Sequence, residues 1–113
     1  IGTLYPASDM KYKGISSLVL LEDVARRASS AGWCLEWADC VVIAQEPRLS
    51  SRLQDMVRAM EQALPPEWRN RIHLKAKSGE GEGAVGSCCS VVCHAAATLS
   101  ACGLRREELD ERR

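Results

Sequence analysis

A continuous apolar run at residues 39–45 restricts the possible folds of this chain more than any other feature. The run is too short for a buried helix, and its centre, residues 41–43, consists of β-branched side chains, which favour strands. Trp33, Leu35 and Trp37 lead into it with strand-like alternation, and Pro47 follows, where a strand must end. Because the run does not alternate with polar residues, it predicts a strand buried on both faces.

Helical patterns lie on both sides of this strand. Apolar residues recur at three- and four-residue steps over residues 18–28, and Ser16 or Ser17 can cap the helix that they predict. A second apolar stripe runs through residues 53–64, after a possible capping box formed by Ser51 and Gln54. We therefore expect one helix before the strand and one after it.

The second half of the chain adds a strand and a flexible loop. Residues 71–77 alternate between apolar and basic side chains, which predicts a strand with one solvated face. A glycine-rich loop follows at residues 79–86, and the apolar residues 87–99 fit either a strand or a helix by their pattern. The order of elements predicts an α+β domain in which helices pack on one face of a small mixed sheet.

Length and charge limit the remaining possibilities. A chain of 113 residues with 46% hydrophobic and 27% charged residues is suited to one globular domain. We place this domain at residues 1–103 and a charged, solvated tail at residues 104–113. The net charge is zero, so nothing attracts nucleic acid over a long range, and we expect no nucleic-acid partner. No apolar run is long enough for a transmembrane helix.

Six cysteines and no Cys-x-x-Cys pair occur in the sequence. Since the chain has long periodic segments, unlike a loop-rich disulfide scaffold, we interpret the cysteines as mostly reduced, small core residues. The group Cys88, Cys89, Cys93 and His94 offers an alternative, a soft-metal or redox site.

Four sequence blocks, in this order, resemble the 2-C-methyl-D-erythritol 2,4-cyclodiphosphate synthase family. The first, residues 1–14, reads Ile-Gly-Thr-Leu-Tyr-Pro-Ala-Ser-Asp and then Tyr-Lys-Gly, similar to the family's Asp-Ile-Gly-x-x-Phe-Pro-Asp-x-Asp and its following Lys-Gly. The second is the helix start Ser17–Leu21. The third, residues 42–49, reads Val-Ile-Ala-Gln-Glu-Pro-Arg-Leu, and the fourth, residues 74–80, reads Leu-Lys-Ala-Lys-Ser-Gly-Glu.

This resemblance implies an activity in non-mevalonate isoprenoid synthesis. The family converts 4-diphosphocytidyl-2-C-methyl-D-erythritol 2-phosphate to the cyclodiphosphate and CMP, a phosphorus–oxygen lyase reaction. It uses zinc together with magnesium or manganese, and it forms homotrimers whose active sites lie between neighbouring subunits. The resemblance also implies a location in the plastid stroma or the bacterial cytoplasm.

The matching blocks assign candidate roles to individual residues. Arg48 and Glu80 are the catalytic candidates, and Glu80 is also the candidate ligand of the second divalent ion. The nucleotide-binding candidates are Ala44, Arg48, Leu49, Ser50, Lys77 and Ser78. The candidates for binding the methylerythritol end of the substrate are Ile1, Gly2, Tyr5 and Asp9.

The chain also departs from the family pattern. The family's zinc ligands precede the first block, and neither His73 nor His94 matches a ligand position, so we expect no zinc ligands in this sequence and a sheet without the family's first strand and helix. In the family, residues 87–99 correspond to a strand at the trimer axis, which directs the cysteines to that axis. Two interpretations stay open: a synthase whose metal-binding part lies outside this sequence, and a catalytically inactive descendant that is a structural or regulatory subunit of a larger plastid assembly.

Overall fold

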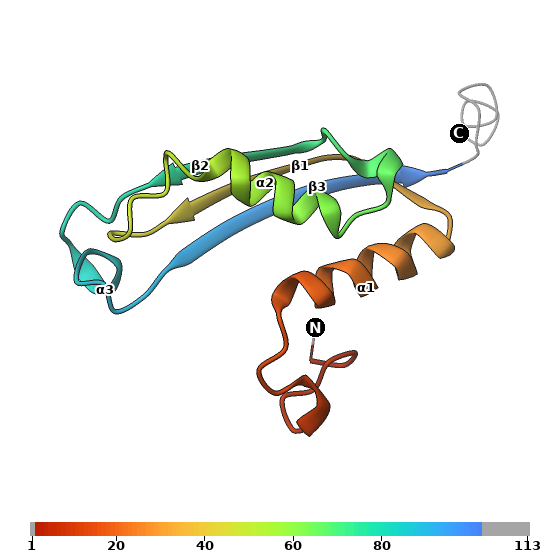
Figure 1. The fold of residues 1–113 in the computed structure, drawn as a ribbon, viewed down its shortest axis with the longest axis horizontal. Coiled ribbons are helices and arrows are strands. Elements are labelled where there is room, and N and C mark those ends of the chain that lie inside the picture. Colours follow the sequence, from red (N-terminus) through yellow and green to blue (C-terminus); the bar gives the residue numbers. More distant parts are fainter. Residues whose placement is uncertain (1, 103–113) are drawn as a thin grey trace, which may run out of the picture.

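A mixed sheet of three strands forms the centre of the computed structural model, which describes residues 2–102 (Figure 1). The strand order is β2-β1-β3, with β2 parallel and β3 antiparallel to the central strand β1. The strands are β1 (Trp33–Ile43), β2 (Ile72–Lys77) and β3 (Val92–Ala101). The predicted 103/104 domain boundary and the charged tail lie outside the described residues, as does Ile1.

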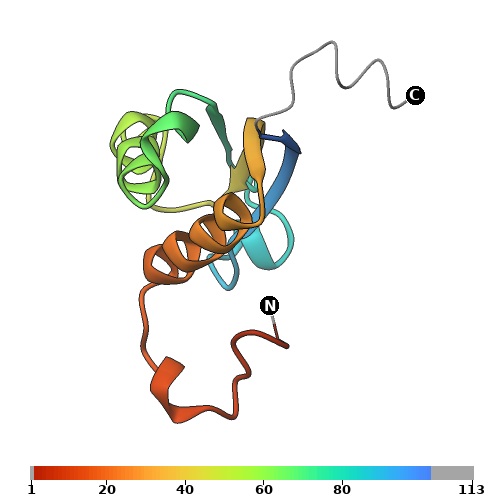
Figure 2. The same ribbon diagram turned by 90° about the vertical axis from the view of Figure 1, so that its right-hand side faces the viewer.

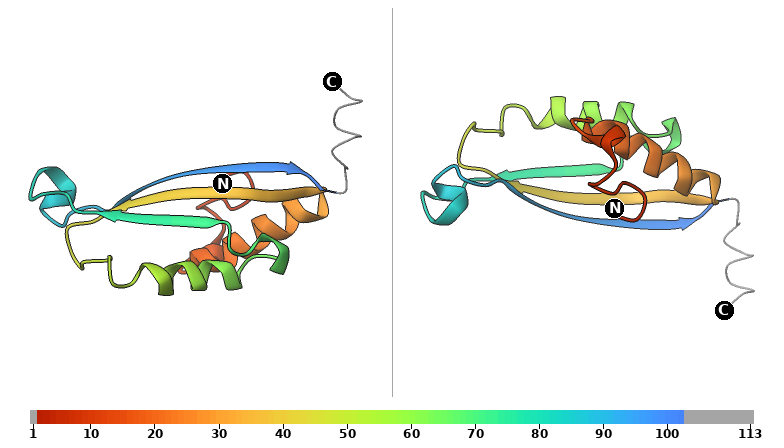
Figure 3. Two further views of the ribbon diagram at one scale, coloured as in Figure 1. Left: turned by 90° about the horizontal axis from the view of Figure 1, so that it is seen from above. Right: turned by 90° about the horizontal axis from the view of Figure 1, so that it is seen from below.

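The two long helices lie on the same side of the sheet, as the end view in Figure 2 and the edge views in Figure 3 show. The helical elements are η1 (Met10–Tyr12), α1 (Ser17–Ser30), α2 (Leu53–Gln62), η2 (Pro66–Trp68) and α3 (Gly83–Gly86). Together with the mixed sheet, this arrangement confirms the predicted α+β architecture. No helix within residues 2–102 is long and apolar enough to cross a membrane.

The predicted start is confirmed for helix α1 and is wrong for helix α2. Ser16 caps α1, because its Oγ accepts a hydrogen bond from the Leu18 amide at 3.2 Å. Helix α2 begins after Arg52, which makes no side-chain cap, so the capping box predicted for Ser51 and Gln54 is wrong. The helix begins two residues beyond Ser51, which places that hydroxyl outside the capping position.

The alternation predicted for β2 is confirmed, since its apolar side chains are half-buried and its basic ones exposed. The segment at residues 87–99, which fits either a strand or a helix by its pattern, is a strand from residue 92 onward, and this strand, β3, pairs with β1 along its length. The pairing shifts by one residue between Leu35 and Trp37, so Glu36 lies in a β-bulge. Strands β2 and β3 each pair with only one other strand among the described residues.

The core lies between the sheet and the two long helices. Its centre consists of Ala25, Leu35, Leu64 and Trp68. The prediction that β1 is buried on both faces is wrong, because the helical elements that pack against it, α1 and η2, lie on one side of the sheet and no element within residues 2–102 covers the other side. Of the strand's residues, only Leu35 and Val42 are buried.

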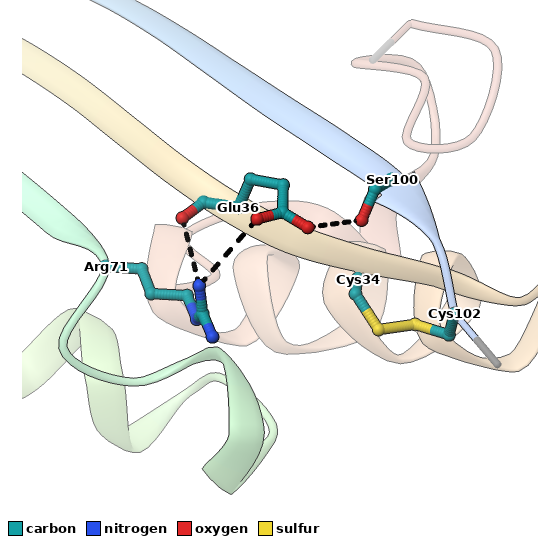
Figure 4. The surroundings of a disulfide bond; sticks show 5 residues. All are labelled: Cys34, Glu36, Arg71, Ser100 and Cys102. Carbon is teal, nitrogen blue, oxygen red and sulfur yellow. Dashed lines mark hydrogen bonds and ion pairs between the residues drawn. A yellow bond between two sulfur atoms is a disulfide. The ribbon is translucent and has the colours of Figure 1, made fainter. Parts of the chain in front are cut away.

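The interpretation of the cysteines as mostly reduced core residues is confirmed in one part and wrong in the other: four of the six are free thiols, but three of these four are exposed and the other two cysteines are bonded to each other. Cys34 forms a disulfide with Cys102, which joins the beginning of β1 to the residue after β3 (Figure 4). Cys40 is half-buried, and burial raises the pKa of its thiol. The three remaining thiols are exposed because they lie in the α3–β3 connection and on the uncovered strand β3: Cys88, Cys89 and Cys93.

Candidate nucleotide-binding cleft

The carboxyl ends of β1 and β2 lie side by side at one end of the sheet (Figure 1). They do so because the two strands are parallel, and their pairing continues to the last residue of each strand, Ile43 opposite Lys77. The Ala44 amide then donates a hydrogen bond to the Lys77 carbonyl at 3.0 Å, which extends the ladder by one residue. The residues that follow the two strands therefore begin next to each other, although they are more than thirty positions apart in the sequence.

A cleft of about 270 Å³ lies between these two segments. All six predicted nucleotide-binding residues line it: Ala44, Arg48, Leu49, Ser50, Lys77 and Ser78. The guanidinium-bearing Arg48 and the ammonium-bearing Lys77 are both exposed, so two positive charges lie at an accessible opening. Pockets for small ligands usually range from about 300 Å³ upward, so this volume suits part of a nucleotide rather than a whole large substrate.

Two further residues, Gln45 and Ala76, line the cleft. Gln45 positions the glycine-rich loop, because its Oε1 accepts a hydrogen bond from the Gly81 amide at 3.0 Å. The loop is folded tightly on itself, and a Cβ on Gly86 would lie 2.2 Å from the Gly81 carbonyl carbon. The sequence contained a signal for Gln45, since it belongs to the third block of the family pattern.

Glu80 lies at the start of this loop but is not one of the cleft-lining residues. Its backbone is left-handed, with φ of 53°, and its amide donates to Ser78 Oγ at 3.0 Å. This conformation is unfavourable for a non-glycine residue, and the Ser78 hydroxyl helps to stabilise it. Glu80 is two positions along the chain from Ser78, the nearest cleft-lining residue in the sequence, and lies at the same end of the sheet as Arg48.

No three histidine, cysteine, aspartate or glutamate side chains within residues 2–102 gather closely enough to hold a metal ion. His73 and His94 lie on β2 and β3, and the group Cys88, Cys89, Cys93 and His94 does not form a metal site. Glu80, the predicted ligand of a second divalent ion, lies in the loop after β2, at the cleft end of the sheet. A hard divalent ion bound there needs additional oxygen ligands, such as phosphate oxygens of a substrate.

The predicted substrate-binding residues Gly2, Tyr5 and Asp9 lie in the N-terminal segment, which packs near α1 and not at the cleft (Figure 1). Asp9 caps η1 by accepting a hydrogen bond from the Lys11 amide at 3.1 Å. Gly2 is exposed. Within one chain, these residues and Arg48 do not share a site.

Tyr5 is buried and holds the N-terminal segment onto α1. Its hydroxyl donates a hydrogen bond to Asp23 Oδ2 at 2.5 Å, and its ring packs edge-to-face on Tyr12 with 5.4 Å between centroids. Arg26 and Arg27 also donate to the Asp23 carboxylate. The Tyr5 hydroxyl, followed by the two guanidinium groups, holds the pKa of Asp23 well below its usual range, and the same hydrogen bond raises the pKa of Tyr5.

A larger open groove, of about 1100 Å³, runs between α2 and β2. Leu53, Val57 and Arg58 of α2 lie on one side of it, and His73 and Lys75 of β2 lie on the other. None of the predicted site residues lines this groove. The volume of a pocket therefore does not identify the candidate site. The smaller cleft is the candidate because the segments that follow β1 and end β2, both with predicted site residues, meet there.

Comparison with known proteins gives consistent matches. Residues 1–100 match the YgbB family. The 2-C-methyl-D-erythritol 2,4-cyclodiphosphate synthase of Treponema denticola is 38% identical over 86 residues, which are 76% of this chain and 53% of that protein. The bifunctional IspDF structure from Campylobacter jejuni matches with a TM-score of 0.79 and 31% identity, over 89% of this chain and 27% of that one.

A solved 2C-methyl-D-erythritol-2,4-cyclodiphosphate synthase in its CDP-bound form is 29% identical and matches with a TM-score of 0.70, over 88% of this chain and 63% of that one. In eight curated relatives of this kind, the chain spans between 25% and 63% of their length.

Proposed function

The chain belongs to the YgbB family, and we propose that it carries the cytidine-nucleotide cleft of a 2-C-methyl-D-erythritol 2,4-cyclodiphosphate synthase. The proposed substrate is 4-diphosphocytidyl-2-C-methyl-D-erythritol 2-phosphate. In the reaction, an oxygen of the 2-phosphate attacks the β-phosphorus, the bond from that phosphorus to the bridging oxygen breaks, and CMP leaves. Such a transfer depends on alignment of the two phosphates and on neutralisation of their charge.

The observation that carries the proposal is the convergence of the third and fourth sequence blocks on one cleft. Five nucleotide-binding candidates lie in two separate blocks and the sixth, Ser50, directly follows the third block, and all six line this cleft. A relative with a similar fold is named as CDP-bound. The family therefore supports the ligand class, and the parallel pairing of β1 and β2, which brings the two segments together, supports the proposed location.

Arg48 and Lys77 are suited to the diphosphate. A guanidinium presents a planar set of donors that matches two phosphate oxygens at once, and an ammonium adds a compact positive charge. The two side chains come from opposite walls of the cleft, since Arg48 follows β1 and Lys77 ends β2. In the proposed complex they hold the diphosphate between them, while Ala44 and Leu49 contact the nucleoside.

The residues that the structure describes fit the two implied metals differently. Glu80 fits as one ligand of a magnesium or manganese ion whose other ligands are phosphate oxygens and water. Such an ion, when bound, neutralises charge on the diphosphate. Zinc has no set of three protein ligands within residues 2–102, so no step is assigned to it.

The N-terminal candidates fit the proposal if two chains share a site. Gly2, Tyr5 and Asp9 lie away from the cleft of their own chain, as expected when they contact a substrate held mainly by a neighbour. We assign the same role to Ile1, which lies outside the described residues. The proposed assembly is a homotrimer, and the proposed compartment is the bacterial cytoplasm or the plastid stroma.

The alternative, a non-catalytic subunit of a larger assembly, has less support. The relatives carry the names of cyclodiphosphate synthases or of bifunctional enzymes that include one. In addition, two cationic side chains, Arg48 and Lys77, line the nucleotide cleft. We therefore favour the enzymatic function.

Calorimetric titration of the full chain with CDP tests the proposal. We expect saturable binding and a dissociation constant that rises about tenfold or more in Arg48→Ala, because a charge-assisted hydrogen bond to phosphate is lost. Arg58→Ala is the matched control, since Arg58 is an exposed arginine on α2 outside the cleft lining. It should bind CDP like the unchanged chain.

Two results would contradict this assignment. The first is the absence of binding at millimolar CDP by a chain that circular dichroism shows to be folded. The second is equal CDP affinity for the Arg48 and Arg58 variants, which would place the nucleotide elsewhere.

A further inference from the structure

The glycine-rich loop, residues 79–86, is attached to a distant part of the chain by the side chain of Gln45. This side chain reaches the loop from the segment after β1, and its Oε1 accepts a hydrogen bond from the Gly81 amide at 3.0 Å. Within residues 2–102, every other hydrogen bond of the loop goes to a residue between positions 78 and 90. Figure 1 shows the loop, which includes α3, beyond the ends of β1 and β2.

Inside the loop, the backbone is closely packed and closed on itself. The Glu82 amide donates a hydrogen bond to the Gly79 carbonyl at 3.0 Å, and the Gly86 amide donates to the Glu82 carbonyl at 2.8 Å. A Cβ on Gly79 would lie 2.7 Å from the Gly86 nitrogen, so a larger side chain does not fit there without a shift. Because the loop is braced internally, its orientation relative to the cleft depends on the contact that holds it from outside.

Two hydrogen bonds fix the backbone on both sides of the Glu80 α-carbon. The Glu80 amide donates to Ser78 Oγ at 3.0 Å, and the next amide, that of Gly81, donates to Gln45 Oε1. These amides belong to the two planar peptide groups that define φ and ψ of Glu80, and therefore the direction of its Cα–Cβ bond. Both acceptors are side chains of residues that line the nucleotide cleft.

The conformation that these contacts hold is one that glutamate does not adopt readily. The φ of Glu80 is 53°, in the left-handed region, which is sterically unfavourable for a residue with a Cβ. Such a conformation persists where the surrounding contacts over-determine it. Without the Gln45 acceptor, the peptide group between Glu80 and Gly81 is free to rotate, because glycine tolerates many backbone conformations, and the Glu80 side chain changes direction.

We propose that Gln45 is a positioning residue that holds the Glu80 carboxylate where it binds a divalent ion on the nucleotide diphosphate. The proposed role rests on the proposed function, which assigns the diphosphate to the cleft and the ion to Glu80. Gln45 acts through the backbone of the loop and is not itself a ligand of the ion. The effect of the ion on nucleotide affinity therefore depends on a side chain that the ion does not touch.

Calorimetric titration of the full chain with CDP, once in EDTA and once in saturating Mn²⁺, tests this role. The quantity compared is the ratio of the two dissociation constants, because a direct effect of Gln45 on the nucleotide changes both constants and cancels in the ratio. In the unchanged chain we expect Mn²⁺ to lower the dissociation constant about tenfold, a typical coupling between two ligands. In Gln45→Leu, which is similar in size and has no acceptor, this gain should fall to about twofold or less.

Three further variants separate positioning from a general effect of removing a glutamine. Gln54→Leu, which changes an exposed glutamine on α2 outside the cleft lining, should keep the full gain. Glu80→Gln should lose the gain, and Gln45→Leu added to it should lose no more, because a residue that acts through another is not additive with it. Gln45→Asn is one methylene too short for the Gly81 contact, and it takes the place of the leucine variant should that variant fail to fold.

Hydrogen–deuterium exchange read by mass spectrometry measures the loop directly. In Gln45→Leu, amides of residues 79–86 should exchange about tenfold faster than in the unchanged chain, as in a local opening. Amides of residues 72–77 in β2 are the internal reference and should change by less than about twofold.

The outcomes distinguish this role from the function on which it rests. CDP binding with a Mn²⁺ gain that survives in Gln45→Leu would overturn the positioning role and leave the nucleotide cleft supported. A gain that persists in Glu80→Gln but disappears in Gln45→Leu would do the same, and so would equal CDP affinity with and without Mn²⁺ in the unchanged chain. Absence of CDP binding in every sample would overturn the proposed function and the role of Gln45 with it.

Discussion

Replacement of Trp68 gives the sharpest test of how this small core is held together. Trp68 is 4% exposed, ends the short helix η2, and packs in the cluster with Ala25, Leu35 and Leu64. Trp68→Ala removes roughly 150–200 Å² of buried apolar surface. At about 25 cal/mol per Å², the free energy of unfolding should fall by about 4–5 kcal/mol, close to the range measured for such changes.

Trp68→Phe separates packing from polarity. The Trp68 Nε1 is buried and finds no hydrogen-bond acceptor among the residues that the structure describes. Phenylalanine loses roughly 1 kcal/mol of apolar burial, but it also removes an unpaired buried donor that costs about 1–3 kcal/mol. The two effects oppose each other, so this variant should stay within about 1 kcal/mol of the unchanged chain.

Urea unfolding followed by far-UV circular dichroism measures these differences. Trp37→Ala is the matched control, since Trp37 is 44% exposed and its removal should cost roughly half as much as that of Trp68. A phenylalanine variant as unstable as the alanine variant would refute the reasoning, because it would mean that the indole N–H contributes favourably. An alanine variant no less stable than the Trp37 control would show that the cluster around Trp68 is not the core.

Three other predictions follow from named contacts. Because the pKa of Asp23 is lowered in the folded chain, the ionised carboxylate adds to the free energy of unfolding at neutral pH, and this contribution is lost as the pH falls below about 4, the ordinary aspartate range. The Asp23→Asn variant should therefore lose less stability in acid than the unchanged chain, as measured by urea unfolding at several pH values. The pKa of Tyr5 is raised in the folded chain, so the protonated hydroxyl adds to the free energy of unfolding below about pH 10, and this contribution is lost as the pH rises above that value. The Tyr5→Phe variant should therefore lose less stability at alkaline pH than the unchanged chain in the same urea-unfolding measurements. In maleimide labelling, the Cys40 thiol should react more slowly than the three exposed thiols, because burial raises its pKa and limits access, and an equal rate would contradict its placement.

Local patterns predicted the elements that depend on neighbouring residues. The cap at Ser16 and the alternation of β2 were predictable, because each depends on residues only a few positions apart. The cleft residues were expected from the family resemblance, and the structure gives the physical reason that they converge. The two segments of the cleft directly follow two strands, and parallel strands bring their carboxyl ends together.

Features that depend on distant pairing were not predictable from the same patterns. The apolar run in β1 indicates a tendency to be buried, but it does not indicate how many faces are covered. The Cys34–Cys102 bond depends on the register between β1 and β3, across 68 positions. The sequence contains one indication of the Tyr5–Asp23 contact. Tyr5 occupies the place of a phenylalanine in the family block, and the added hydroxyl needs a hydrogen-bond partner when it is buried.

The bare face of the sheet affects how the stability of this chain depends on concentration. Only eight hydrophobic residues of the described chain are buried, and Trp37 and Leu99 on the strands are at least 40% exposed. If copies of the chain cover one another at this face, folding and association become one equilibrium, and the melting temperature rises with protein concentration. A melting temperature that is constant over a hundredfold dilution would instead describe a monomer that tolerates its exposed strands.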